Sequence, residues 1–233
     1  MHRYSLCIVP RFLWGGLFSL CISMMVSAMD PPVLSTATPT VDLPSSVFQT
    51  VCDDLRAVTL VEANFVEEKT LHILSHPLQS KGTILFSPQQ GVYRVIQEPL
   101  HQELLITHSQ FVQKDAQGTV QRMSVRGQPA AQAFVDVFLS FFAGDRRGWE
   151  KTFDAVFAGS VSDWKIELIP HRKSPAAKAL RKIILEGRGG VLDAMTLTET
   201  NGDKTYTLYS HQQISHDEKH EASFHFPTDL KGP

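Results

Sequence analysis

Alternation of apolar and polar residues predicts that most of this chain folds into β-strands. Within residues 78–99, the runs 82–86 and 92–96 are rich in β-branched and aromatic residues. The turn formers SPQQG separate them, so the segment predicts a β-hairpin. No helical pattern interrupts the next alternating runs, which favours an antiparallel meander over parallel units. Further strands are expected from residue 61 and over 102–107, 109–114, 120–125, 164–168, 180–185, 191–198 and 204–209.

The hairpin should carry one apolar face, because successive side chains of a strand point to opposite sides. We expect this face to hold Ile84 and Phe86, with Tyr93 and Val95 on the same side. Arg94 would then point away from it. Such a face needs an apolar partner, which can be a second sheet, a helix or a ligand.

Two other stretches have the helical period. From Ser45, apolar residues recur at intervals of three and four up to Val58. Residues 129–159 begin with a stripe that covers more than half of a helix, and Gly144 to Gly148 then interrupts it. Trp149, Phe153 and Phe157 predict a shorter helical continuation. These helices can fill the concave side of the sheet as a core, or leave a partly filled cavity for an apolar ligand. The pattern alone favours the filled core.

The N-terminus has the pattern of a secretory signal peptide. Arg3 and Arg11 accompany an apolar run that begins at Phe12, and small residues end at Ala28. The run is only about 14 residues long, whereas a membrane span needs about 20. A lipid-modified Cys21 is a weaker alternative, because a bulky leucine precedes it. We therefore expect residues 1–28 to be a signal peptide cleaved near Ala28, and the protein to lie in the periplasm.

Residues 29–44 are proline-rich and have no hydrophobic period, so we expect a flexible leader there. Residues 45–233 would then form a single domain, with 129–159 as a helical insertion. Cleavage removes two arginines and no acidic residue, which changes the net charge from −2 to −4. Nucleic acid is accordingly not an expected partner. Cys52 remains as the only cysteine of the mature chain, so no internal disulfide is expected.

Motifs for catalysis and cofactor binding are missing from the sequence. It has no Gly-x-Ser-x-Gly, no phosphate-binding loop and no dinucleotide-binding glycine pattern. His72 and His76 have the spacing of a helical ligand pair but fall where a strand should turn, and His216 and His220 lie in a charged tail. We therefore expect no enzyme, no metal site and no cofactor.

The order of several short motifs resembles that of the LolA-like outer-membrane lipoprotein carrier family. The first half follows the family pattern with Phe65 in the first strand, then the run 82–86, Tyr93 and Pro99. In the second half, Trp164-x-x-x-Leu168-x-Pro170 is similar, as is Leu197-x-Glu199-x-x-Gly202-Asp203-x-Thr205. The resemblance spans roughly 45–211, and the order and spacing of its motifs carry its specificity.

The resemblance implies an α+β fold: a strongly curved antiparallel sheet of about 10–11 strands, an open half β-barrel, with helices over the concave face as a lid. It also implies a periplasmic carrier that shields the acyl chains of a lipoprotein or other lipid and moves them between an inner-membrane donor and an outer-membrane acceptor. The expected cargo is a lipid or an acylated protein, and the expected state is a monomer. The cavity candidates are Phe65, Ile84, Phe86, Tyr93, Val95, Leu104, Ile106, Phe134, Phe138, Phe142, Trp164, Ile166 and Leu197.

One position departs from the family pattern. Typical carriers have an arginine, associated with lid closure, just before the proline of the opening hairpin, whereas this chain has Ser87 before Pro88. The departure leaves two alternatives open. One is a carrier of a hydrophobic product other than a lipoprotein, and the other is a periplasmic structural or interaction module with a filled core.

Overall fold

A computed structural model describes residues 45–126 and 129–217, together with residues 227 and 230. The expected signal peptide and leader, 1–44, lie outside the described residues. Three α-helices are α2 (Ser45–Arg56), α3 (Pro129–Phe142) and α4 (Arg146–Glu150), and a short 3-10 helix, η1, spans Pro175–Lys178. The strands are β1 (Leu60–Thr70), β2 (Leu78–Ser87), β3 (Gly91–Glu98), β4 (Gln102–Ile106), β5 (Gln110–Lys114), β6 (Val120–Ser124), β7 (Phe153–Ser160), β8 (Asp163–Pro170), β9 (Leu180–Arg188), β10 (Val191–Glu199) and β11 (Lys204–Ser215).

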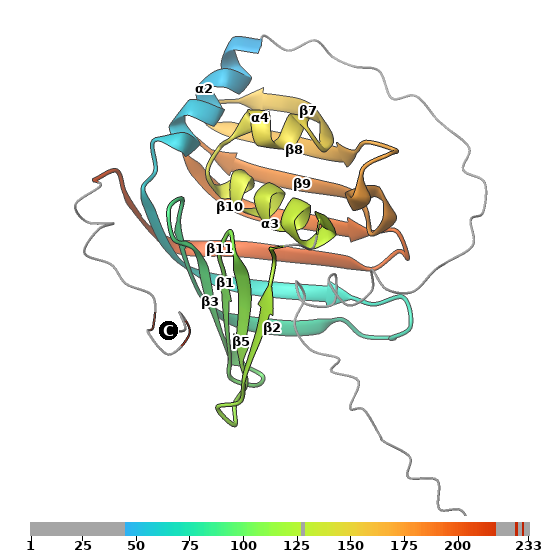
Figure 1. Ribbon diagram of the computed structural model, residues 1–233. Coiled ribbons are helices and arrows are strands. Elements are labelled where there is room, and N and C mark those ends of the chain that lie inside the picture. Colours follow the sequence, from blue (N-terminus) through green and yellow to red (C-terminus); the bar gives the residue numbers. More distant parts are fainter. Residues whose placement is uncertain (1–44, 127–128, 218–226, 228–229, 231–233) are drawn as a thin grey trace, which may run out of the picture.

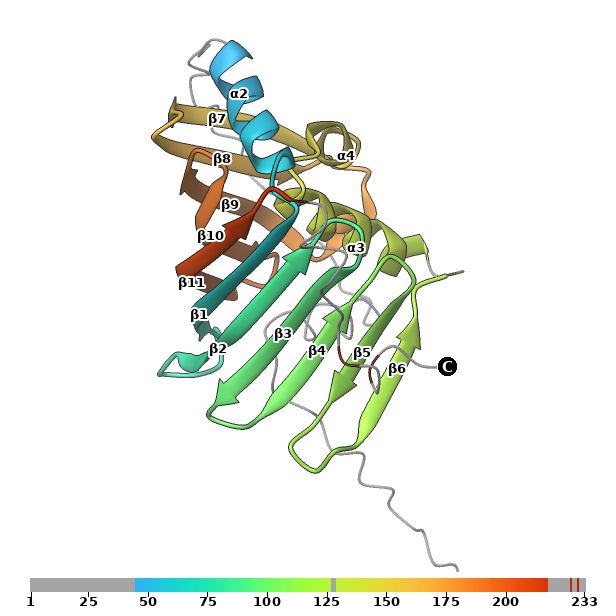
Figure 2. The ribbon, with the colours of Figure 1, turned by 90° about the vertical axis from the view of Figure 1, so that its left-hand side faces the viewer.

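All the strands form one antiparallel sheet of 11 strands with the order β6-β5-β4-β3-β2-β1-β11-β10-β9-β8-β7. The sheet is open, because β6 and β7 are its two edges. Its first and last strands in the chain, β1 and β11, pair in the middle. The expected open, curved antiparallel sheet is therefore confirmed (Figure 2).

The sheet order determines where the helices lie. The chain leaves edge strand β6, passes through α3 and α4, and re-enters the sheet at the opposite edge as β7. This connection must cross one face of the sheet from edge to edge. Figures 1 and 2 show α3 and α4 on the inner side of the curved sheet, with α2 near one end. The concave face is thus covered by the segment that joins its two edges.

The main hydrophobic core lies between these helices and the concave face. From α2, Phe48 stacks on Phe157 of β7 at 5.1 Å between ring centroids, and Val51 and Cys52 are fully buried. From α4, Trp149 is also fully buried. Burial in this core raises the pKa of the Cys52 thiol to about 11, so it stays neutral and packs as a small apolar group.

The register of the hairpin contradicts the expected orientation of β3. Ile84 pairs with Arg94 and Leu85 with Tyr93, and directly opposed residues of neighbouring strands share a face. Arg94 therefore lies on the concave face, whereas Tyr93 and Val95 lie on the convex face, where Tyr93 packs beside Leu85. The expectation was wrong because alternation defines two faces of a strand, and β3 has apolar residues on both of them.

The helical continuation expected after Trp149 is also wrong. Phe153 and Phe157 lie on β7, opposite Pro170 and Ile166 of β8. A spacing of four residues fits one turn of a helix and equally fits two repeats of a strand, so this pattern could not separate the two. The helical insertion accordingly ends at Glu150.

Close packing between Trp164 and Gly187 gives a prediction about stability. The indole Nε1 of Trp164 donates a hydrogen bond to the Gly189 carbonyl at 3.0 Å, and the ring lies over Gly187. A Cβ added at Gly187 would lie 2.1 Å from the Val191 carbonyl oxygen and 2.5 Å from the Trp164 ring. We predict that Gly187→Ala lowers the free energy of unfolding in urea by about 1–3 kcal/mol. Gly118→Asn is the control, because Gly118 has a positive φ that asparagine tolerates and open space around it. Equal stability of the two variants would contradict this packing.

Candidate functional site

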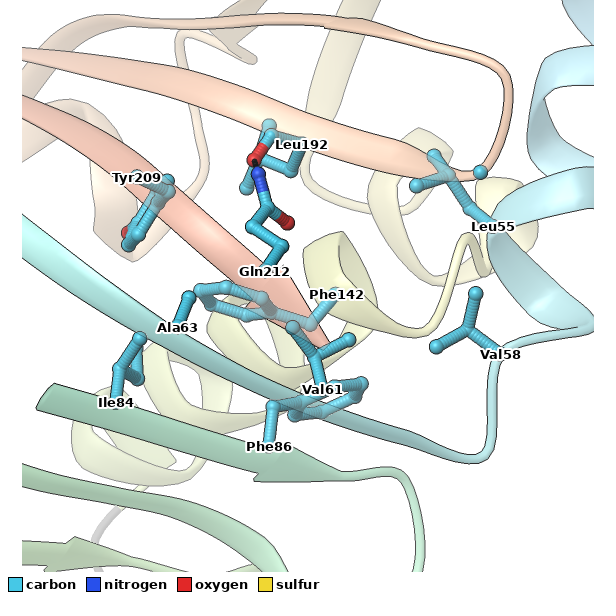
Figure 3. A pocket seen from close by; sticks show the side chains of 11 residues that line it. Leu55, Val58, Val61, Ala63, Ile84, Phe86, Phe142, Leu192, Tyr209 and Gln212 are labelled. Atoms are coloured by element: carbon cyan, nitrogen blue, oxygen red, sulfur yellow. Dashed lines mark hydrogen bonds between the residues drawn. The ribbon is translucent and has the colours of Figure 1, made fainter. Parts of the chain in front are cut away.

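An apolar cavity lies between α2, α3 and the concave face, and it is nearly filled. It has about 30 Å³ of free space, enough for one or two water molecules but far too little for an acyl chain. Figure 3 shows its walls, which come from α2, β1, β2, α3, β10 and β11. They consist of Leu55, Val58, Val61, Ala63, Ile84, Phe86, Phe142, Gly190, Leu192, Tyr209 and Gln212.

The Phe142 side chain is the part of α3 that fills this cavity. Its ring centroid lies 5.1 Å from that of Phe86 on β2 and 6.3 Å from that of Tyr209 on β11. It also contacts the ring of Phe138 one turn earlier, edge to face, at 5.3 Å. In Figure 3 the Phe142 ring points toward Ala63 of β1. The last turn of α3 thus occupies the centre of the concavity.

A second, smaller cavity of about 10 Å³ adjoins the first, since Ile84 and Tyr209 line both. Phe138 of α3 covers it, just as Phe142 fills the first cavity. Most of its walls are apolar, but Arg94 and Thr207 also face it. The lining is Phe65, Ile84, Val92, Arg94, Leu104, Ile106, Phe138, Thr207 and Tyr209.

Charged side chains cross the middle of the concave face in two ion pairs. Arg94 Nη2 lies 3.0 Å from Glu67 Oε2, with side-chain exposures of 5% and 4%. The Thr207 hydroxyl donates to the same carboxylate at 3.1 Å, and Lys69 Nζ donates to Glu199 Oε1 at 3.3 Å. Buried charges are stable only when they are paired, so each arginine or lysine of this row has its own carboxylate.

The Arg94 guanidinium is held from two directions. Its Cζ lies 3.9 Å from the centroid of the Phe65 ring, a cation–π contact. The Glu67 carboxylate contacts the edge of the guanidinium at Nη2. Burial raises the pKa of the neighbouring Tyr209 hydroxyl above its usual range, although the charge of Arg94 opposes this effect. Tyr209 therefore remains neutral at physiological pH beside a permanently charged arginine.

Seven of the thirteen candidate cavity residues line one of the two cavities: Phe65, Ile84, Phe86, Leu104, Ile106, Phe138 and Phe142. Trp164, Ile166 and Leu197 are buried on the concave face but belong to the packed core and line neither cavity. Tyr93 and Val95 lie on the convex face. Phe134 lies within α3, and its side chain is outside the described residues.

On the convex face, the Tyr93 hydroxyl takes part in a network of polar side chains. The hydroxyl donates to Glu103 Oε2 at 2.6 Å, and Lys114 lies 3.1 Å from the same carboxylate group. Burial opposes ionisation of Glu103, but hydrogen bonds from Tyr93, Lys114 and His101 outweigh it and lower its pKa. Tyr93 therefore belongs to a polar network on the face of the sheet opposite to the cavities.

The sequence reasoning missed Arg94 and Tyr209 as cavity residues. Both have a polar atom and a large apolar surface, so neither is marked by hydropathy as inward-facing. The pairing of Ile84 with Arg94 and of Phe65 with Tyr209 places them on the concave face. Ser87, by contrast, is fully buried, and its hydroxyl accepts a hydrogen bond from the Gln90 backbone N–H within the hairpin turn.

Within residues 45–126 and 129–217, no three histidine, cysteine, aspartate or glutamate side chains gather in a way that could hold a metal ion. In the same part of the chain, none of the helices combines the length and the hydropathy that crossing a membrane requires.

Residues 40–221 match the protein family described as outer membrane lipoprotein carrier protein LolA-like. No curated protein sequence matches the chain. Similar solved structures include a LolA superfamily protein from Nitrosomonas europaea, at 10% identity and a TM-score of 0.40, covering 72% of this chain and 94% of that chain. A DUF1329 family protein from Desulfovibrio piger is similar at 10% identity and a TM-score of 0.38, covering 73% and 92%. LprF from Mycobacterium bovis is similar at 11% identity and a TM-score of 0.33, covering 72% and 91%.

The buried ion pair gives a prediction about stability. Arg94→Met removes the charged partner of Glu67 and leaves a buried carboxylate whose remaining partner among the described residues is the Thr207 hydroxyl, so we expect a loss of about 3–5 kcal/mol in the free energy of unfolding. Arg94→Met combined with Glu67→Gln should recover most of that loss, because the glutamine is neutral and can still accept from Thr207.

The matched control is Lys81→Met, which removes the exposed Lys81–Glu98 pair and should change stability by less than about 1 kcal/mol. Urea unfolding of the four proteins measures these differences. If Arg94→Met were no more destabilising than Lys81→Met, the pair would not be buried as described.

Proposed function

The chain belongs to the family of LolA-like outer membrane lipoprotein carriers, and from this premise we propose that it binds acyl chains under α3 and carries them between membranes. The cargo is a lipoprotein or another lipid, taken from a donor at the inner membrane and delivered to an acceptor at the outer membrane. The observation that carries the proposal is the position of Phe138 and Phe142. Both rings fill apolar space on the concave face. Both belong to α3, a helix that crosses this face without backbone pairing to any strand.

Energetics support an exchange between these rings and a ligand. Each buried methylene contributes about 0.8 kcal/mol, so a chain of roughly sixteen carbons contributes on the order of 12 kcal/mol of gross hydrophobic transfer. Displacing Phe138 and Phe142 exposes apolar surface and offsets part of that gain. A carrier needs this compensation, because cargo that was bound with the full transfer energy could not be released.

The attachment of α3 is suited to movement. At its outer side, Gln132 Nε2 donates to the His108 carbonyl at 3.4 Å, and Asp136 lies 3.8 Å from His108 Nδ1 in an exposed pair. Exposed pairs of this kind contribute at most about 1 kcal/mol. Side-chain packing is therefore the main interaction that must be replaced for α3 to act as a lid, and it includes Phe141 against Trp149 and Phe153 as well as the rings of Phe138 and Phe142.

The N-terminal pattern supports the proposed location. A signal peptide cleaved near Ala28 would deliver the chain to the periplasm, with 29–44 as a leader before α2. There the protein would act as a single-domain, non-enzymatic monomer. Within the described residues the cavities are lined mainly by hydrocarbon and aromatic groups, which suits the binding of an apolar chain.

A pyrene-labelled monoacylglycerol tests the proposal by fluorescence titration. The wild-type protein should bind it saturably, and Phe142→Ala should bind about 10- to 100-fold more tightly, because burying one aromatic ring is worth about 1.5–3 kcal/mol and the ligand no longer displaces it. The same variant should unfold at lower urea, since it loses a packed ring.

Tyr93→Phe is the control: it removes one hydroxyl on the convex face and should leave probe binding unchanged. The small free volume of these two cavities also suits one competing possibility, a module whose concave face is merely core. That possibility predicts no saturable binding by the wild-type protein, and this result would contradict the carrier proposal.

A further inference from the structure

Arg94 has more hydrogen-bond donors than its surroundings use. Its Nε and Nη2 atoms are buried and have no hydrogen-bond partner among the described residues. The contact of Nη2 with Glu67 at 3.0 Å is an ion pair without the alignment of a hydrogen bond. Buried polar groups are nearly always satisfied, so unsatisfied donors on a permanently charged group require an explanation.

The Arg94 side chain that carries these donors lines the smaller cavity. Arg94 lines it together with hydrocarbon side chains such as Val92 and Leu104, and Phe138 of α3 covers it. Thr207 also faces the cavity, but its hydroxyl already donates to Glu67. A ligand that displaced Phe138 would therefore find an apolar wall with one cluster of unused N–H donors.

The surrounding charges select the kind of oxygen that can bind there. Arg94 and Glu67 together are neutral, and so are Lys69 and Glu199. A free carboxylate next to Arg94 would compete with the Glu67 carboxylate and be repelled by it. A carbonyl oxygen carries no net charge and accepts hydrogen bonds well, so it meets the donors without this repulsion.

We propose that Arg94 is a polar subsite that hydrogen bonds the carbonyl oxygen of an ester- or amide-linked acyl chain, an inference that rests on the proposed carrier function. Because Ile84 and Tyr209 line both cavities, a carbonyl held at Arg94 directs the attached chain into the space that Phe142 fills. The site thereby recognises the ester or amide linkage as well as the apolar chain. It distinguishes acylated cargo from free fatty acid or hydrocarbon.

A matched pair of lipids tests this subsite. Monopalmitoylglycerol and its hexadecyl ether analogue have the same head group and a chain of the same carbon number, but only the ester has a carbonyl. Both displace the pyrene-labelled probe from the full chain at concentrations below micelle formation. We expect the wild-type protein to bind the ester about tenfold more tightly, as one hydrogen bond to a charged donor allows.

The double variant Arg94→Met, Glu67→Gln should abolish that preference while it keeps its affinity for the ether. Lys69→Met with Glu199→Gln is the matched control, because it also removes a buried ion pair from the concave face but lines neither cavity, and it should keep the preference. Palmitate forms a third arm and should bind the wild-type protein more weakly than the ester.

The outcomes separate this inference from the proposed function. If the wild-type protein binds ester and ether equally, or binds palmitate best, the subsite is refuted while the carrier proposal stands. If the wild-type protein binds none of the three lipids, the carrier proposal fails. The ratio of ester to ether affinity in the wild-type protein decides the question even if the double variant does not fold.

Discussion

The structure depends on one topological constraint, which is that a single connection joins the two edges of an open sheet. The strand order begins at β6 and ends at β7, and these strands are neighbours in the chain. The segment between them must span the whole face, and the curvature of the sheet makes the concave side the one that it covers (Figure 2). Because the face is apolar, the segment must be apolar as well. The aromatic helix α3 follows from this requirement.

The same constraint limits how firmly α3 can be held. A helix that crosses a sheet without pairing with its strands is attached by side-chain packing, here through the buried Val135, Phe138, Leu139 and Phe141 and the partly buried Phe142. Such packing is replaceable by any chain of similar shape and hydrophobicity, because the hydrophobic effect is not directional. Backbone pairing within the sheet is not replaceable in this way. In the proposed carrier, the sheet is therefore the wall of the site and α3 is the cover that a ligand displaces.

The buried charges on the wall are the exception to its apolar character. Glu67 and Lys69 on β1 face the concavity, and Arg94 and Glu199 pair with them from neighbouring parts of the sheet. Replacing such pairs by hydrophobic residues is often neutral or stabilising, so packing alone does not explain them. Unused donors on Arg94 give this one residue a role in recognition, and its pairing with Glu67 limits that role to neutral acceptors.

Strand alternation and the helical period predicted most of this architecture. They identified the meander, α2 and α3, and the family resemblance added the curved open sheet with helices over its concave face. The inward face of β3 could not be predicted, because Val92, Tyr93 and Val95 leave both faces apolar and only the pairing of Ile84 with Arg94 decides between them. The burial of Arg94 could not be predicted for the same reason, because it depends on contacts with Phe65 and Glu67 of another strand.

A crystal structure of the protein saturated with monopalmitoylglycerol would show directly whether an acyl chain takes the place of the α3 rings. We expect the acyl chain to lie between Phe86 and Tyr209, with the Phe142 ring displaced and α3 moved away from the sheet. A complex in which Phe142 keeps its place and the lipid binds elsewhere would contradict this expectation.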